Sequence, residues 1–136
     1  MKDVSEIRYA NVAEALVKAV PDLRAHYEEE LRWWGDEKPG PHIIFGDVLN
    51  PYLIDLLDSG HHEDKLRQVF QFLELLAKHD DVHIQELVAV TVCERLGNRP
   101  EHLKRARKFM GPRTQQFSKE VEDFWGRRPD DGGNVN

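Results

Sequence analysis

Two histidines in the stretch HDDVH have the spacing of metal ligands on a helix. His79 and His83 lie four positions apart, as zinc-binding histidines on one helical face do. Asp80 and Asp81 between them are typical of a boundary between two helices, because aspartate often caps a helix N-terminus. The two rings would then belong to different helices and share no face. A metal-dependent enzyme using His79 and His83 is therefore a minor alternative, and we predict no metal site.

Other residue types with catalytic potential fit structural roles better. Asp47 and Asp55 could pair as carboxylates on one helix, but each also occupies a polar position of an amphipathic pattern. The single cysteine, Cys93, lies in the apolar run LVAVTVC and is expected to be buried. The sequence has no G-x-S-x-G motif and no glycine-rich phosphate loop. We predict a protein that is not an enzyme and has no cofactor.

The elements that must position these residues are helices. Apolar side chains recur with helical period along segments that are separated by proline or glycine. These segments cover about residues 5–19, 21–34, 43–59, 62–79, 82–97, 100–110 and 112–126. They predict an all-α fold of about seven short helices packed as antiparallel pairs. The helix lengths leave open a HEAT-like stacking of the last two pairs.

Two stretches within these helices are compatible with more than one structure. Leu87 to Cys93 is apolar and β-branched, as a buried strand would be, but its flanks IQEL and CERL favour a helix. Asn50-Pro51 either caps and restarts the third helix or kinks it. We expect a single helical domain over residues 1–126 and a disordered tail over residues 127–136, which hold few apolar side chains.

Charge is distributed unevenly along the chain. The 136 residues have a net charge of −6, and 40% of them are hydrophobic, which fits a packed and soluble domain. Residues 1–64 hold 14 Asp/Glu against 6 Lys/Arg, whereas residues 99–113 hold 6 Lys/Arg against 1 Asp/Glu. An acidic surface repels nucleic acid and speeds encounter with basic proteins. We find no apolar signal segment or membrane-spanning run and expect a cytoplasmic protein.

Two adjacent tryptophans end the second expected helix. At about 100° per residue, Trp34 continues the stripe of Leu23, Tyr27 and Leu31, so we assign it to the core. Trp33 lies off that stripe, so either the following loop or the third expected helix covers it, or it faces a partner. Exposed tryptophans are frequent anchors of protein interfaces. We therefore predict a partner-binding surface made of Trp33, Glu29, Glu30, Asp36 and Glu37.

The basic stretch RPEHLKRARKFMGPR suggests a nucleic-acid-binding alternative. Lys104, Arg105 and Lys108 are expected on one side of the helix over residues 100–110, where they could neutralise phosphates. The negative net charge and the lack of a helix-turn-helix or zinc-finger pattern argue against this alternative.

Four runs of the sequence, within about residues 43–126, are FGDVLNPYL, FLELLA, VTVCERLGN and RKFMGPRT. Together they resemble small all-helical bacterial immunity proteins of polymorphic or contact-dependent toxin systems. The resemblance carries no catalytic residue and leaves the first two helices unmatched. It implies a protein that binds a cognate toxin and blocks it, often with acidic groups. With the acidic, aromatic surface, it predicts neutralisation of a basic toxin domain such as a nuclease; a scaffolding helical module is the alternative.

Overall fold

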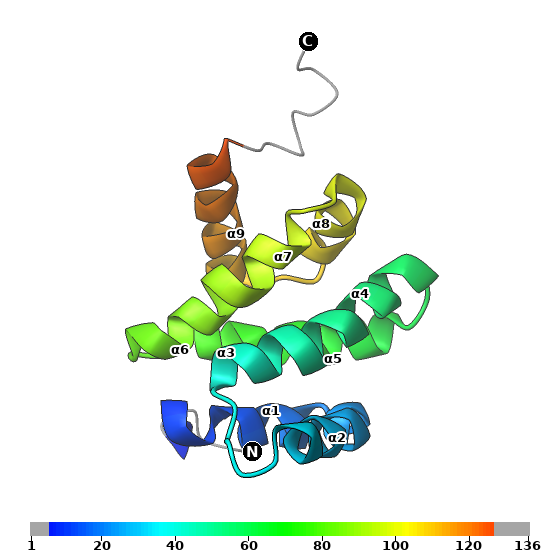
Figure 1. The fold of residues 1–136 in the computed structure, drawn as a ribbon. Coiled ribbons are helices and arrows are strands. Elements are labelled where there is room, and N and C mark those ends of the chain that lie inside the picture. Colours follow the sequence, from blue (N-terminus) through cyan, green and yellow to red (C-terminus); the bar gives the residue numbers. More distant parts are fainter. Residues whose placement is uncertain (1–5, 127–136) are drawn as a thin grey trace.

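The computed structural model describes residues 6–126, which form seven continuous helices and no strand. This confirms the predicted all-α fold. Two of the helices contain an internal π-helical segment, so their parts carry separate labels (Figure 1). The bounds are α1 (Val12–Ala19), α2 (Arg24–Trp34), α3 (Pro41–Ile44) leading through a first π segment (Phe45–Leu49) into α4 (Asn50–Ser59), α5 (Glu63–Ala77), α6 (Val82–Glu86) leading through a second π segment (Leu87–Cys93) into α7 (Glu94–Leu96), α8 (Pro100–Arg107) and α9 (Pro112–Trp125).

The ends of the helices follow local sequence signals, with one exception. The Asp81 side chain accepts a hydrogen bond from the His83 N–H at 2.9 Å and so caps α6, as predicted. The first helix is shorter than expected, because α1 begins at Val12 after a 3₁₀ turn over Tyr9–Asn11. Residue 5, the expected start of this helix, lies outside the described residues, as does the tail over residues 127–136.

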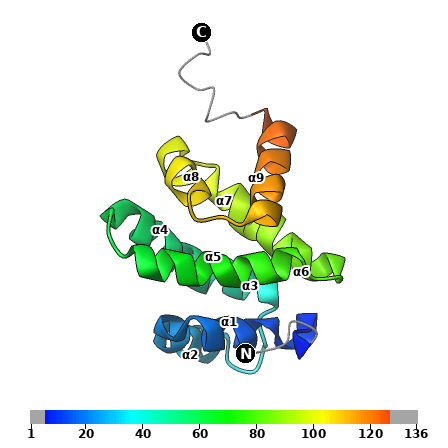
Figure 2. The ribbon, with the colours of Figure 1, turned by 180° about the vertical axis from the view of Figure 1, so that it is seen from behind.

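The helices are stacked in three tiers (Figures 1 and 2). The hairpin of α1 and α2 forms the first tier, the α3–α4 helix lies beside α5 in the second, and α6–α7, α8 and α9 form the third. The third tier therefore holds three helices rather than a pair. Helix α5 contacts α1 on one side and α9 on the other. No helix within residues 6–126 is long and apolar enough to cross a membrane.

The first π segment ends at Leu49, two residues before Pro51. Proline has no N–H, and in a regular helix its ring meets the carbonyl four residues earlier. Here the Asn50 N–H donates to Phe45 O, five residues back, which widens the turn. We infer that the wider turn makes room for the proline ring, because the helix continues to Ser59 without a break. The helix therefore neither ends nor restarts at Asn50.

The carboxylate of Glu74 on α5 holds the N-terminus of α9. It accepts hydrogen bonds from the backbone N–H groups of Arg113 at 3.0 Å and Thr114 at 2.9 Å, and from the Thr114 hydroxyl at 2.8 Å. The first N–H groups of a helix have no partner within the helix, so a neighbouring carboxylate stabilises them. Burial raises the pKa of Glu74, but the hydrogen bonds from Thr114 and Arg113 outweigh it, and the net shift is downward.

Gly111 is required for this close approach. An added methyl group at Gly111 would overlap the Glu74 side chain, whereas one at Gly40, with the same extended backbone before a proline, would meet nothing within 4 Å. We expect Gly111→Ala to lower the free energy of unfolding by about 1–3 kcal/mol, and Gly40→Ala to change it by less than about 1 kcal/mol. Urea unfolding of the two variants measures the difference. Equal free energies of unfolding would contradict the proposed contact.

The lowered pKa of Glu74 also predicts a pH dependence. A carboxyl group whose pKa falls on folding contributes stability above its unfolded value, here 4.5, and loses that contribution as the pH falls through the folded value. Glu74→Gln should therefore have a lower free energy of unfolding than the wild type at pH 7, and this difference should become smaller below pH 4.5. Urea unfolding of both proteins across this pH range measures the difference. A difference that does not change with pH would argue against a native carboxylate at Glu74.

Candidate functional site

Trp33 projects from the end of α2 into solvent. Its side chain is 77% exposed, so the following loop does not cover it. Its ring meets Trp34 edge to face, with 5.4 Å between ring centroids and 77° between planes. Trp34 is half-buried rather than in the core as predicted, and its Nε1 donates a hydrogen bond to Glu30 at 3.0 Å. The Trp33 ring thus packs against Trp34, whose own ring is held by the hydrogen bond to Glu30.

The predicted acidic residues lie on the same end of the hairpin. Glu29, Asp36 and Glu37 are exposed, and Glu30 is half-buried. Together with Trp33 they form what we call the Trp33 surface. Gly35 ends the helix with a φ of +65°, a value that favours glycine, and the chain turns there toward Asp36.

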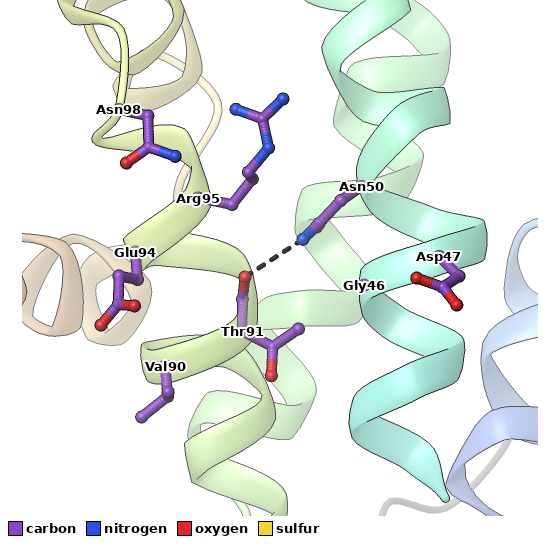
Figure 3. A pocket seen from close by; sticks show the side chains of 8 residues that line it. All are labelled: Gly46, Asp47, Asn50, Val90, Thr91, Glu94, Arg95 and Asn98. Carbon is purple, nitrogen blue, oxygen red and sulfur yellow. Dashed lines mark hydrogen bonds between the residues drawn. The ribbon is translucent and has the colours of Figure 1, made fainter. Parts of the chain in front are cut away.

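Glu30 faces the carboxyl group of Asp47, which comes from the first π segment. Burial raises the pKa of Glu30, the Trp34 N–H lowers it, and the hydrogen bond and charge of Asp47 raise it; the net shift is upward. In Figure 3 the Asp47 side chain points away from α6–α7, on the side of the N-terminal hairpin. The neighbouring carboxyl of Asp47 is therefore Glu30, and not Asp55 as the spacing in the sequence suggested.

The histidines proposed as an alternative metal site have other contacts. The backbone N–H of Asp81 donates to His79 Nδ1 at 2.9 Å, and His79 Nε2 lies 2.7 Å from Ile7 O. Both ring nitrogens of His79 are thus occupied by the backbone. His83 is exposed on the next helix, where its Nδ1 lies 3.8 Å from the Glu86 carboxylate. Within residues 6–126, no group of three or more potential metal ligands is found.

The basic helix is partly committed to contacts within the protein. Arg105, expected on the exposed side, is half-buried and lies 5.9 Å from the centre of the Phe109 ring. Arg107 donates to the Ser118 hydroxyl at 3.2 Å. Lys104 and Lys108 are exposed. The structure therefore does not present the continuous row of free basic side chains that the helical pattern suggested.

The sequence did not reveal a second site, where the two π segments meet. Asn50 follows the first π segment, and its Nδ2 donates to Thr91 O in the second at 3.1 Å (Figure 3). The Thr91 hydroxyl lies 2.5 Å from His42 Nδ1. π segments are rare and are often found at functional sites. Asn50-Pro51 was the one sequence signal of this arrangement, and it was interpreted as a cap or kink.

A pocket of about 400 Å³ opens beside this hydrogen bond, and we call it the π pocket. This volume lies in the range of small-molecule sites. Its walls come from the α3–α4 helix, the α6–α7 helix and the turn after α7, which together supply residues 46, 47, 50, 90, 91, 94, 95 and 98. In Figure 3 the Arg95 guanidinium extends into the space between the two helices. Two segments that are distant in the sequence thus bring acidic and basic residues to the lining of one cavity.

The raised pKa of Glu30 predicts a stabilising substitution. An acid whose pKa rises on folding is destabilising once it ionises, so this cost is small below the ordinary value of 4.5 and appears as the pH rises through the folded value. Glutamine carries no charge and retains an acceptor for Trp34. We expect Glu30→Gln to raise Tm by about 1–3 °C at pH 7 and by less at pH 4.

Glu29→Gln is the matched control, because Glu29 is an exposed glutamate on the same helix. Thermal unfolding at the two pH values makes the comparison. A lower Tm for Glu30→Gln at pH 7, or equal changes in both variants, would show that Glu30 and Asp47 do not oppose each other.

Comparison with known proteins gives one match. No curated protein and no solved structure matches the chain. A family model described as "Domain of unknown function (DUF7674)" matches residues 13–126, which include both the Trp33 surface and the π pocket. The match covers most of the chain, and the protein therefore belongs to the DUF7674 family.

Proposed function

We propose that this protein is a binding protein that captures a basic protein partner through the Trp33 surface. The observation that carries the proposal is the 77% exposure of Trp33, a large apolar side chain that a folded protein usually covers. Because its ring already rests on Trp34, little conformational freedom is lost when a partner covers it. Tryptophans of this kind are common energetic centres of protein interfaces.

The charge around Trp33 favours a basic partner. Residues 28–38 include Glu28, Glu29, Glu30, Asp36 and Glu37 against two basic side chains. Opposite charges on two proteins accelerate their association and disfavour partners of the same charge. The Glu30 and Asp47 carboxyl groups are held side by side without a cation between them in the described structure. A lysine or arginine of the partner would relieve their repulsion.

The form of this function that we propose is that of a cytoplasmic immunity protein. The protein would cover the active site of a cognate toxin domain, such as a nuclease whose basic surface attracts phosphate. Support comes from the exposed aromatic residue, from its acidic surroundings and from the sequence resemblance to immunity proteins.

A scaffolding module is the second candidate, and a separate observation favours it. Phe124, on the last turn of α9, is 80% exposed, and Trp125 beside it is 52% exposed. This aromatic pair lies on the third tier, whereas Trp33 lies on the first (Figure 1). A protein that joins two partners would use both surfaces, and an immunity protein would need one.

Growth rescue distinguishes the two candidates. We expect co-expression of the wild-type protein to restore growth of cells that express the toxic product of the adjacent gene. Trp33→Ala combined with Glu29→Lys should abolish rescue and weaken the complex by at least about 100-fold, because it removes an anchor and reverses a charge. Phe124→Ala removes an equally exposed aromatic ring and should rescue fully.

Purified complexes measured by calorimetry supply the affinities. Rescue that is unaffected by the Trp33→Ala and Glu29→Lys changes would exclude the Trp33 surface. Loss of rescue with Phe124→Ala would favour the scaffolding role. No rescue together with no complex would exclude the immunity function.

A further inference from the structure

A second pocket, of about 440 Å³, lies between α5 and the turn that joins α8 to α9 (Figure 2). We call it the Phe109 pocket. One wall is a row at intervals of four along α5, and the other follows α8; together they supply Glu63, Arg67, Gln71, Lys108 and Phe109. The volume lies in the range of small-molecule sites. The pocket therefore brings the basic segment over residues 99–113 against a helix of the second tier.

Two flat surfaces line the Phe109 pocket. Phe109 is half-buried against the core, and the Arg67 Cζ atom lies 5.9 Å from the centre of its ring. The Arg67 guanidinium is also paired with Asp64 at 3.1 Å and with Glu63 at 3.3 Å. Aromatic rings and guanidinium planes are the side-chain surfaces on which nucleobases stack in proteins. A planar ring bound here would meet surfaces that the folded chain already provides.

Lys108 supplies a positive charge that the protein itself does not use. Its side chain is exposed and makes no hydrogen bond or ion pair within residues 6–126. Residues 99–113 hold 6 Lys/Arg against 1 Asp/Glu, so this segment attracts anions although the whole chain is negative. Lysine ammonium groups commonly bind phosphate. Lys108 can therefore hold an anionic group without giving up a contact within the protein.

The remaining two lining side chains can bond to the edge of a base. The Gln71 amide both donates and accepts, and it is exposed without a hydrogen-bond partner in the described part of the chain. Glu63 uses Oε1 for Arg67, and its other carboxylate oxygen can accept from an N–H group. The edges of nucleobases carry both donors and acceptors. An aromatic anion without such an edge would leave both side chains unused.

We propose that the Phe109 pocket binds a nucleoside monophosphate. The base would stack beside Phe109 and Arg67, and its edge would bond to Gln71 or Glu63. The phosphate would pair with Lys108. A simple anion or an uncharged ring would use only one part of the pocket.

A nucleic-acid strand fits the surroundings of the pocket less well than a single nucleotide. Arg105 donates to His61 O at 3.4 Å, and Arg107 donates to the Ser118 hydroxyl at 3.2 Å. These contacts leave no continuous row of free cations to follow a phosphate backbone. Nucleotide binding goes beyond partner capture at the Trp33 surface and does not depend on it.

A panel of the common ribonucleoside monophosphates, each added singly, tests this proposal. We expect at least one to raise Tm and to bind in calorimetry with a Kd of about 1 mM or lower. The matching nucleoside lacks the phosphate, and ribose 5-phosphate lacks the base, so each should bind at least about tenfold more weakly. A tetranucleotide of the same base should bind within about tenfold of the monophosphate, because the pocket holds one base.

Three variants locate the site. Lys108→Gln should weaken binding of the monophosphate at least about tenfold and leave that of the nucleoside unchanged, because only the phosphate meets the lysine. Lys119→Gln is the matched control, since Lys119 is an exposed lysine on α9 outside the pocket, and it should change neither. Phe109→Leu keeps an apolar side chain against the core but removes the ring, and should weaken both at least about tenfold. Urea unfolding checks that each variant is folded, and Lys108→Gln alters only an exposed side chain.

Any of four results would overturn the proposal. The first is that no monophosphate binds at about 10 mM, tenfold above the expected Kd. The second is that ribose 5-phosphate binds as well as the monophosphate, which would leave a site for anions alone. The third is that Lys108→Gln binds the monophosphate as well as Lys119→Gln does, which would place the phosphate elsewhere. The fourth is that the tetranucleotide binds at least about 100-fold more tightly, which would indicate a nucleic-acid surface.

Discussion

The hydrogen bond from Asn50 Nδ2 to Thr91 O joins the second tier of helices to the third, and both candidate sites depend on the backbone around it (Figure 3). It spans 41 positions of sequence and pairs a buried side-chain amide with a carbonyl of the second π segment. Without it, two polar groups at a helix crossing would lack partners, at a cost of about 1–3 kcal/mol each. Pro51 explains why the helix carrying Asn50 is widened at this point.

This widened turn has consequences on both faces of the α3–α4 helix. On one face, Asn50 reaches Thr91 beside the π pocket. On the other, Asp47 meets Glu30 on α2, at the edge of the Trp33 surface. The same irregularity therefore shapes both the wall of the π pocket and the edge of the Trp33 surface.

Much of the fold could be predicted because its determinants are local. Helical periodicity, residues that end a helix such as Gly35 and residues that begin one such as Asp81 identified the helices and most of their ends. The candidate sites were harder because they depend on tertiary contacts. The position of Trp33 around its helix did not determine whether its ring is exposed. Glu30 and Asp47 are 17 positions apart, and no local sequence pattern predicts their contact. The second π segment has no proline; its β-branched residues crowd a regular helix, but that pattern did not distinguish a π segment from a strand.

The side-chain amide of Asn50 is the most direct probe of the helix crossing on which both sites depend. In ¹⁵N–¹H correlation spectra, its two protons can be assigned by their loss in Asn50→Asp. We expect them to exchange slowly with water, and one to be shifted downfield by its bond to Thr91 O. Rapid exchange and the chemical shifts of a solvent-exposed asparagine would show that the two π segments are not joined in this way.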